Sequence, residues 1–391
     1  MNSSSDVIII GGGINGTSLA YHLAKRGASV TLLEKEFIAG GPTGLSSAIV
    51  RQHYSNPVTA RMALNSIRVW QNFSEMIGGN SGFIQTGFLM GVRPEDVAGL
   101  KANIEMQQSL GISTSFVTPE EMREIEPQLD PSGLGGGAYE PNSGYCDAAA
   151  AANGFANAAQ AYGAGIQTGI TATGFQVKGG KFVSVETDQG PLSAGSVILA
   201  AGPWTPQLLD KIGVHIPIIA ARVKVALYRR PEDFPRHRVW ADFISQVYLR
   251  PETGNLMLVG SISPKEASDE VKDPDNFNER VDIGTLAEFA ERAAMRYPAM
   301  ERSHAASSYV SLYDITPDWH PIMDAVPEFE GLYVCAGGSG HGFKLAPAVG
   351  EMMANLVLHG KQGDDDIKLF SFNRFAEGKP VIGQYEYSIL G

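Results

Sequence analysis

The chain has 391 residues, of which 43% are hydrophobic and 18% are charged, and its formal net charge at pH 7 is −12. This length exceeds what one compact core normally reaches, so it predicts about two domains. The acidic balance argues against a nucleic-acid surface, which needs clustered Lys and Arg, and we expect no nucleic-acid partner. Cys146 and Cys335 lack the spacing of metal ligands, so the sequence predicts no metal site and no disulfide framework.

The first residues, MNSSSDVIII, have neither the basic region nor the long apolar stretch of a secretory signal. No apolar run reaches the roughly 18 residues that a membrane span needs. We therefore expect a cytoplasmic protein that is not an integral membrane protein.

Residues 6–36 have the pattern of a strand, a helix and a second strand. The apolar run 7–10 predicts a short buried strand, apolar residues at helical spacing predict a helix over 14–25, and 30–33 predict a second strand that ends in Glu34. The chain is thus expected to begin with a βαβ unit.

Three glycines join the first strand to the helix. Gly11, Gly13 and Gly16 fit the pattern G-x-G-x-x-G. One glycine makes the tight turn, the next lets the backbone approach a pyrophosphate, and the third lets helix and strand pack closely. Glu34 is placed to accept hydrogen bonds from the ribose hydroxyls of an adenosine. The pattern predicts a dinucleotide site and does not by itself choose between NAD and FAD.

The middle of the chain alternates between helical and strand-like segments. In chain order, the expected segments are a helix over 58–76, a strand pair over 82–93, an amphipathic helix over 94–111, a helix of small residues over 148–165, strands over 166–187, and a buried strand within 197–205 that ends in a Gly-Pro turn. From 206 to about 322 the pattern is longer, aromatic and strand-rich, which indicates a second pass through a substrate domain.

The stretch 338–347, GSGHGFKLAP, follows an apolar strand-like run and precedes a helical one. Gly337, Gly338, Gly340 and Gly342 together indicate backbone that lies against a flat ligand at a helix N-terminus. Lys344 lies at this helix start, where the helix dipole disfavours a positive charge, so we expect an anion nearby.

Together these residues resemble the flavin-dependent amine and amino-acid oxidoreductases of the D-amino acid oxidase type, and most closely the sarcosine oxidases. The resemblance rests on GGGINGTSLAYHLAKRG, Glu34, the loop TGLSSAIVRQHY, ILAAGPWT, SLYDITPDWHPIMD and above all GSGHGFKLAPAVG. It implies an α/β Rossmann-like FAD-binding domain with an inserted α+β substrate domain on an antiparallel sheet. We expect the FAD domain in 1–80, 145–205 and 323–391, and the substrate domain in 81–144 and 206–322.

The resemblance extends the expected FAD contacts beyond the glycine motif. The predicted cofactor-binding residues are Gly11, Gly13, Ile14, Asn15, Gly16, Glu34, Lys35, Thr43, Gly44, Ser46, Ser47, Ala172, Ala201, Gly202, Trp204, Gly338, Ser339, Gly340, His341, Gly342, Phe343 and Lys344. In the monomeric sarcosine oxidases a cysteine before the last strand bonds covalently to the flavin, and the matching residue here is Ser311. Non-covalent FAD is therefore expected.

The resemblance also implies which residues act on the substrate. In the relatives an arginine and a lysine hold the substrate carboxylate over the flavin, and they map to Arg51 and Lys344. His341 either polarises the flavin or packs beside it, and Tyr54 and Tyr313 match aromatic positions that either line the substrate pocket or belong to the core. These five are the predicted catalytic residues.

Other polar residues in these segments are interpreted differently. His53 and His320 are expected to be structural, and Arg61 and Arg222 are expected to lie at the surface or in ion pairs. The relatives also have a lysine that faces flavin N5, and Met257 is expected at that position, which argues against direct oxidase activity.

The leading functional hypothesis is FAD-dependent oxidation of a secondary or N-alkylated amino acid to an imine that hydrolyses. The expected partners are a small carboxylated amine and either O2 or a protein or quinone electron acceptor, and the chain could act as a homo-oligomer or as a subunit of a hetero-oligomer. The alternatives are a dehydrogenase subunit that passes electrons to a partner protein, a 2-hydroxy-acid dehydrogenase and a flavin-binding protein without activity. The aromatic residues Trp240, Phe243 and Tyr248 suggest an apolar pocket above the flavin.

Overall fold

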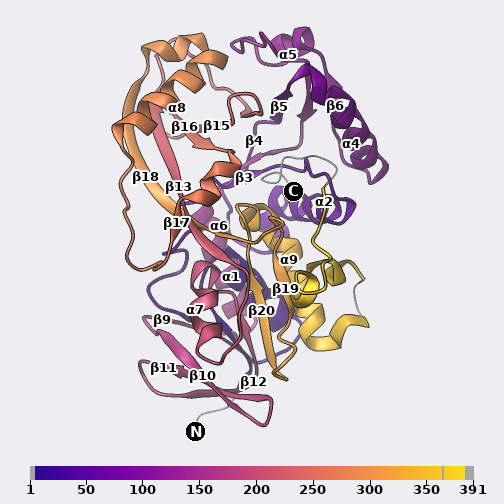
Figure 1. The fold of residues 1–391 in the computed structure, drawn as a ribbon, viewed down its shortest axis with the longest axis vertical. Coiled ribbons are helices and arrows are strands. Elements are labelled where there is room, and N and C mark those ends of the chain that lie inside the picture. The colour runs from indigo at the N-terminus through magenta and orange to yellow at the C-terminus, as the bar shows by residue number, and fades with distance from the viewer. Residues whose placement is uncertain (1–4, 363–364, 384–391) are drawn as a thin grey trace.

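The structure, a computed structural model, describes residues 5–362 and 365–383 (Figure 1). Its central sheet has eight strands in these residues, five of them parallel neighbours in the order β20, β12, β1, β2 and β9. The strands are β1 (Ser5–Ile10), β2 (Val30–Glu34), β9 (Gly165–Thr168), β10 (Ala172–Lys178), β11 (Lys181–Thr187), β12 (Leu192–Leu199), β19 (Ile322–Ala325) and β20 (Leu332–Ala336). Strands far apart in the sequence thus share one sheet.

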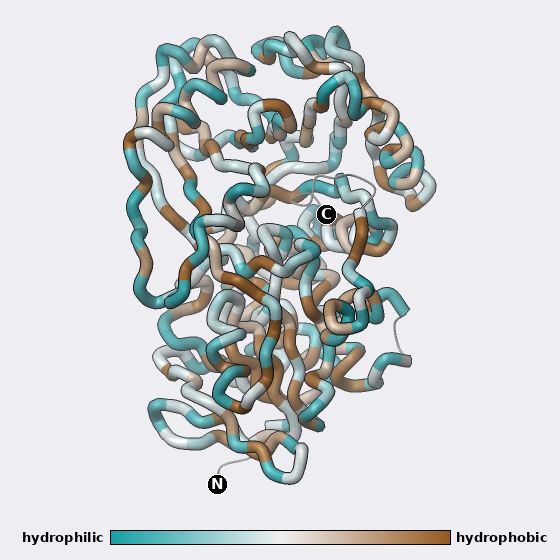
Figure 2. The backbone as a smooth tube through the Cα atoms, viewed as in Figure 1, coloured by the Kyte–Doolittle hydropathy of each residue, from teal (hydrophilic) through white to brown (hydrophobic). Residues whose placement is uncertain are grey.

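The interior of this sheet is apolar because its strands are buried on both faces. Figure 2 shows hydrophobic, brown segments gathered within the lower half of the molecule, where these strands lie. In β1, the residues from Val7 to Ile10 are all buried, as are Val197 to Leu199 in β12. The predicted short buried strands are confirmed.

Helices pack against the sheet and against one another. They are α1 (Ile14–Lys25), α2 (Pro57–Gln71), α3 (Phe73–Met76), α4 (Val97–Ser109), α5 (Pro119–Ile125), α6 (Ala148–Ala161), α7 (Thr205–Asp210), α8 (Ile283–Arg296) and α9 (Gly342–His359). The predicted helix over 58–76 is two helices, because the chain leaves helical geometry at Asn72, which is the C-cap of α2.

Close packing of α9 against α1 brings the two glycine-rich segments of the sequence together. A Cβ atom on Gly350 of α9 would lie 2.3 Å from Ser18 Oγ of α1. The same hydroxyl donates a hydrogen bond of 2.8 Å to the carbonyl of Ala346. The N-terminal ends of both helices therefore face the same region of the molecule.

A second sheet of nine strands, counted over the described residues, lies above the first in Figure 1. Its strands are β5 (Phe88–Val92), β6 (Ser115–Val117), β7 (Gly136–Glu140), β13 (Ile219–Arg229), β14 (Val239–Asp242), β15 (Val247–Glu252), β16 (Leu256–Ser261), β17 (Glu270–Val271) and β18 (His304–Ile315). All pairings are antiparallel except that of β14 with β5. The predicted combination of a Rossmann-like α/β part with an antiparallel sheet is confirmed, whereas the two-domain boundaries stay a prediction.

The predicted strand pair over 82–93 is wrong. β4 (Ile84–Gln85) and β5 belong to different sheets, because β4 pairs with β8 (Gly144–Tyr145), which also pairs with β3 (Ile49–Val50). Gly144 permits this pairing, since a Cβ atom there would lie 2.0 Å from the carbonyl oxygen of Ile84. Among the described residues no helix is both long and apolar enough to cross a membrane.

Candidate active site

The glycine motif makes a close junction between β1 and α1. Gly11 has a φ of +114°, and a Cβ atom there would lie 2.3 Å from the carbonyl oxygen of Ala200. A Cβ atom on Gly16 would lie 2.0 Å from the carbonyl oxygen of Gly11. Gly13, the N-cap of α1, has no side chain to satisfy the first N–H groups, and the first turn has no acidic residue. The helix N-terminus is therefore suited to an anion.

Glu34 lies beside this turn at the end of β2. Its carboxylate accepts hydrogen bonds from Gly12 N at 2.6 Å and from Glu36 N at 2.9 Å, which fix its orientation. Thr43 Oγ1 accepts a hydrogen bond of 3.0 Å from Ile14 N and fixes the following loop against α1. The acid expected to bind a ribose is thus held next to the pyrophosphate position.

A cavity of about 390 Å³ begins at this junction and extends beneath the nine-stranded sheet. It is lined by most of the predicted residues: Gly11, Gly13, Ile14, Asn15, Glu34, Lys35, Thr43, Ser46, Ser47, Ala172, Ala201, Gly202, Trp204, Tyr313, Gly338, Gly340, Gly342, Phe343 and Lys344. Asn15 Oδ1 is buried there without a hydrogen-bond partner among the described residues. A helix N-terminus, an oriented acid and an unsatisfied amide oxygen along one cavity fit a dinucleotide.

One end of the cavity is formed by Lys35, Trp204 and Asp275. Lys35 Nζ lies 3.9 Å from the centroid of the Trp204 ring and forms an ion pair with Asp275. Trp204 Nε1 also donates a hydrogen bond of 3.0 Å to the Asp275 carboxylate. The sequence analysis missed Asp275, because its contact joins the loop after β2 to a segment some 240 positions later.

The opposite end of the cavity lies between the nine-stranded sheet and the turn before α9. Its lining includes Ile49, Val223, Val225, Tyr248, Ser311, Tyr313 and Lys344. A Cβ atom on Gly340, which has a φ of +80°, would lie 2.7 Å from the Tyr313 ring. The turn and the sheet therefore approach each other closely at the position predicted for the substrate.

Asp314, at the end of β18, holds the glycine turn. Its carboxylate accepts a hydrogen bond of 2.7 Å from Gly337 N, and its carbonyl accepts one of 3.0 Å from Ser339 N. Burial raises the pKa of this carboxyl, and the N–H groups of the turn oppose that rise. Sequence reasoning missed Asp314, although an acid at the end of a buried strand in SLYDITPDWHP was a usable signal.

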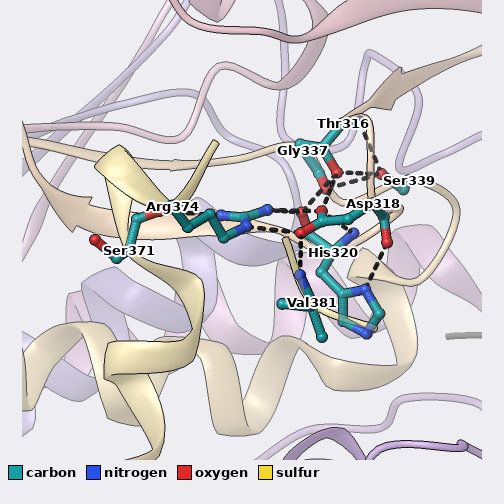
Figure 3. Close-up of polar contacts among 8 residues, drawn as sticks. All are labelled: Thr316, Asp318, His320, Gly337, Ser339, Ser371, Arg374 and Val381. Carbon is teal, nitrogen blue, oxygen red and sulfur yellow. Dashed lines mark hydrogen bonds and ion pairs between the residues drawn. The ribbon is translucent and has the colours of Figure 1, made fainter. Parts of the chain in front are cut away.

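The turn is also tied to the C-terminal segment by the network in Figure 3, which joins Thr316, Asp318, His320, Gly337, Ser339, Ser371, Arg374 and Val381. Ser339 is fully buried, and its hydroxyl accepts a hydrogen bond of 3.2 Å from Thr316 N. Asp318 accepts hydrogen bonds of 2.8 and 2.9 Å from Arg374, whose side chain is 2% exposed. The loop that carries Thr316 is thus held on one side by the turn and on the other by Arg374.

Replacing Arg374 with methionine is expected to lower the free energy of unfolding by about 3–5 kcal/mol, because it leaves the buried Asp318 carboxylate without its cation. Urea denaturation of the purified protein measures this. Arg302→Met is the control, since Arg302 pairs with Asp233 at the surface and its loss should leave the denaturation midpoint unchanged. Equal midpoints for the wild type and Arg374→Met would contradict the structural role.

Arg51, Tyr54 and His341 form a buried group behind the substrate end of the cavity. Arg51 Cζ lies 4.5 Å from the centroid of the Tyr54 ring, and Arg51 Nη2 lies 3.5 Å from His341 Nδ1. Tyr54 Oη is 3.3 Å from the same nitrogen. Lys344, which is 8% exposed, donates a hydrogen bond of 3.1 Å to the carbonyl of Gly340. The structure therefore brings four of the five predicted catalytic residues together, and Tyr313 lies beside Gly340.

The charges in this group shift one another's pKa values. Burial, and then the charge of Arg51, hold the pKa of Lys344 well below its usual range. Burial, followed by the charges of Lys344 and Arg51, holds the pKa of His341 well below its usual range. His341 is accordingly a neutral imidazole at neutral pH, and burial raises the pKa of Tyr54 to about 12, so Tyr54 is a neutral phenol.

Some predicted residues do not line the cavity. They are Gly16, Gly44, Ser339, His341, Arg51 and Tyr54. Gly16 and Gly44 fit close backbone approaches, since a Cβ atom on Gly44 would lie 2.4 Å from the carbonyl oxygen of Ala39. Ser339 uses its hydroxyl to hold the turn, and Arg51 and Tyr54 stand behind Lys344 and His341. Direct contact of these residues with a ligand stays a prediction.

The structural interpretation of the remaining polar residues agrees with their contacts. Arg61 forms an ion pair of 2.6 Å with Asp366, and Arg222 forms one of 3.1 Å with Asp269. His53 and His320 are both buried, and burial lowers the pKa of His53 to about 3. None of these four side chains lines the cavity.

Two expectations about the roof of the cavity are wrong. Met257 is fully buried in a cluster with Trp240 on the face of the sheet opposite the cavity, whereas its neighbour Leu258 packs in the cluster of Tyr248. Because strand side chains alternate between faces, the expected placement of Met257 is shifted by one residue. Trp240 and Phe243 do not line the cavity, but Tyr248 does.

Comparison with known proteins agrees with this geometry. Glycine oxidase from Geobacillus kaustophilus is 27% identical over 96% of this chain and 98% of its own length. Sarcosine dehydrogenase from mouse mitochondria is 26% identical over 95% of this chain, and the match spans 42% of the length of that protein. The solved L-proline dehydrogenase from P. horikoshii has a TM-score of 0.89 at 29% identity and covers 97% of this chain and 100% of its own.

The pattern of the DAO family, described as FAD dependent oxidoreductase, matches residues 6–356. This match decides between the two dinucleotides that the glycine motif leaves open, and the predicted cofactor, FAD, is confirmed. The chain belongs to the DAO family of FAD-dependent oxidoreductases.

Proposed function

We propose that the protein oxidises the C–N bond of a secondary or N-alkylated amino acid to an imine, which water then hydrolyses. FAD, when bound, accepts the hydride equivalent from the carbon next to nitrogen. The observation that carries the proposal is Lys344, a buried lysine at the substrate end of the cavity with no ion-pair partner among the carboxylates of the described residues. A substrate carboxylate would supply the missing anion.

Arg51 supports Lys344 in this role. Arg51 contacts His341, three residues before Lys344, and the charge of Arg51 contributes to the lowered pKa of Lys344. An incoming carboxylate relieves this repulsion and accepts charge-assisted hydrogen bonds. Its binding fixes the adjacent carbon and nitrogen, which is the positioning that hydride transfer needs.

The proton requirements of the reaction are modest. The amine must be neutral, since its lone pair supports the developing iminium. Hydride transfer from the neutral amine gives the iminium directly, so it needs no carboxylate base. His341 is neutral and adds no third positive charge next to the substrate nitrogen. Of the described acidic residues, Glu34, Asp275 and Asp314 line the cavity, and each already accepts a hydrogen bond from a protein group.

The names of similar proteins favour this reaction class. Glycine oxidase, sarcosine oxidase subunit beta from Arthrobacter sp. and L-proline dehydrogenase all bear names of amino-acid substrates. A dehydrogenase that passes electrons to a protein or quinone is the version of the activity that we favour. Three lysines line the cavity: Lys344, Lys35 and Lys211. Lys35 and Lys211 lie with Trp204 and Gln207 at the end opposite Lys344, so neither matches the lysine that faces N5 in oxidases.

We also propose that FAD is bound without a covalent link. Ser311 lines the cavity at the position where the covalent relatives have a cysteine, and a hydroxyl is a much weaker nucleophile than a thiolate at neutral pH. Acid precipitation should therefore release the yellow colour into the supernatant. Colour that stays with the precipitated protein would show a covalent link.

Binding of a simple carboxylate is expected to weaken as the pH rises through the lowered pKa of Lys344. Below this pKa the ammonium is present and attracts the anion; above it Lys344 is neutral and the attraction is lost. Acetate titrations followed by the flavin spectrum, over the whole pH range in which the holoprotein stays folded, measure the dissociation constant without interference from a substrate amine. Lys344→Met should bind weakly at every pH, and an unchanged slope in this variant would contradict the assignment.

The reaction itself is tested by anaerobic titration of the holoenzyme with N-methyl, cyclic and primary amino acids and with 2-hydroxy acids. Bleaching of the flavin by secondary or N-alkylated amino acids is the expected result. Bleaching by hydroxy acids alone would replace the proposal with a hydroxy-acid dehydrogenase, and no bleaching by any of them would contradict it. On admission of air, slow recolouring is expected, whereas rapid recolouring with peroxide formation would show an oxidase.

A further inference from the structure

Three arginines gather at one end of the central strands of the nine-stranded sheet, and we call them the arginine corner. Arg230 follows β13, Arg236 precedes β14, and Arg250 lies within β15. Arg230 and Arg250 are 8% and 6% exposed, whereas Arg236 is exposed. Buried arginines normally satisfy their charge with acids, so this cluster needs an explanation.

The arginine corner lies near the substrate end of the cavity, although none of its three arginines lines the cavity itself. Arg250 follows Tyr248 by two residues on β15, so both side chains lie on the same face of the sheet, roughly 7 Å apart along the strand. Tyr248 lines the cavity. The corner thus begins two residues beyond Tyr248, the residue of β15 that forms part of the cavity wall.

Tyr145 connects the corner to the cavity from the other side. Arg250 Cζ lies 4.6 Å from the centroid of the Tyr145 ring, and Arg236 Nη2 donates a hydrogen bond of 2.7 Å to the Tyr145 hydroxyl. Across the β3–β8 pairing Tyr145 is opposite Ile49, which lines the cavity. Tyr145, Ile49 and Tyr248 pack in one cluster, so Tyr145 links the corner to two residues of the cavity wall.

Positive charge exceeds negative charge in the corner. Glu252 pairs with Arg250 at 2.7 Å, but within the described part of the chain no carboxylate forms an ion pair with Arg230 or Arg236. The Nε atoms of Arg230 and Arg250 are buried and lack hydrogen-bond partners there. The charges of Arg230 and Arg236 therefore have no carboxylate partner there, and the buried Nε donors of Arg230 and Arg250 have no acceptor.

The neighbouring groups do not offset this charge. Arg238, the next arginine of the same segment, is already paired with Glu126. His237 is buried, and burial together with the charges of the three arginines lowers its pKa to about 3, so it is neutral at physiological pH. The unmet requirement is for an anion that reaches the corner from the cavity.

We propose that the substrate carries a second acidic group, and that Arg250 and Arg236 bind it while Lys344 and Arg51 bind the carboxylate next to the amine. This inference rests on the proposed function and narrows its substrate to an N-alkylated amino dicarboxylic acid. Arg250 is the inner contact through its Nε, because its Nη2 is already paired with Glu252, and Arg236, which is exposed, completes the site beside Tyr145. The second acid determines specificity and takes no part in hydride transfer.

The test compares pairs of substrates that differ in one charge. N-methylaspartate, N-methylglutamate and the next longer homologue are each compared with the corresponding side-chain amide, by the rate of anaerobic flavin reduction and by kcat/KM. For the best chain length, the acid is expected to exceed its amide by about 10-fold or more in kcat/KM, because the amide cannot form the charge-assisted bonds.

Variants locate the preference in the corner. Arg250→Gln and Arg236→Gln should each lower kcat/KM for the acid by about 10-fold and leave the amide unchanged. Arg236 is exposed, so its variant retains the fold even if Arg250→Gln does not. Arg229→Met, at the exposed end of β13, is the matched control and should leave kcat/KM unchanged for both the acid and the amide.

The outcomes separate this inference from the proposed function. Equal kcat/KM for acid and amide in the wild type would overturn the inference and leave amino-acid oxidation intact. An acid preference that survives in both arginine variants would overturn it as well. Flavin that no amino acid reduces, dicarboxylic or not, would instead overturn the proposed function.

Discussion

Replacing Lys344 with methionine should reduce kcat/KM for a carboxylated secondary amine by about 10²- to 10³-fold. Removing one member of a buried charge pair costs about 2–5 kcal/mol, and here the unpaired member would be the substrate carboxylate. Methionine keeps the length and apolar stem of lysine, so α9 should keep its packing against α1 and α2. The effect should fall on substrate binding and on the orientation of the C–H bond together.

Stopped-flow reduction of the flavin under anaerobic conditions separates these two contributions, since it gives the dissociation constant and the reduction rate independently. Lys368→Met, a change at an exposed lysine that pairs with Asp365, is the matched control and should behave as the wild type. An amine that lacks a carboxylate is a second control, because it should be a poor substrate that Lys344→Met makes no worse. If Lys344→Met reduced the flavin at the wild-type rate with wild-type affinity, the carboxylate would bind elsewhere.

Local patterns account for what the sequence predicts well. The βαβ unit and the strand, glycine turn and helix near the C-terminus each depend on residues within about thirty positions of one another, where hydrophobic spacing and turn glycines determine the conformation. α1 occurs at Ile14–Lys25 as the pattern predicts, and α9 begins at Gly342. Most residues predicted for the cofactor therefore line the cavity.

Long-range pairings account for what the sequence does not predict. Asp314 reaches Gly337, and Lys35 meets Asp275, through contacts that no local pattern records. The placement of Met257 is wrong because a shift of one residue in a strand moves each side chain to the other face. The arginine corner was missed because it depends on long-range pairing: Arg230, Arg236 and Arg250 come together only when β13, β14 and β15 are assembled.

The glycine motif carries the second large prediction. Replacing Gly16 with alanine is expected to yield protein that purifies with little or no FAD. The added Cβ atom would lie 2.0 Å from the carbonyl oxygen and 3.1 Å from the carbonyl carbon of Gly11, and both belong to backbone. Because neither can rotate away, α1 must move off the end of β1, which displaces the N–H groups that face the pyrophosphate.

The ratio of flavin absorbance to protein absorbance measures this loss, and a titration of the apoprotein with FAD measures the affinity. Without FAD, the overpacked contact should lower the free energy of unfolding by about 1–3 kcal/mol. With FAD present the difference between wild type and variant becomes larger, because only the wild type gains stability from the bound ligand. Gly165→Ala is the control in the same sheet, since its Cβ atom would meet no atom closer than 3.7 Å. Retention of FAD by Gly16→Ala at the wild-type ratio would mean that α1 can shift without disturbing the site, and the close junction between Gly11 and Gly16 would then matter for folding and not for cofactor binding.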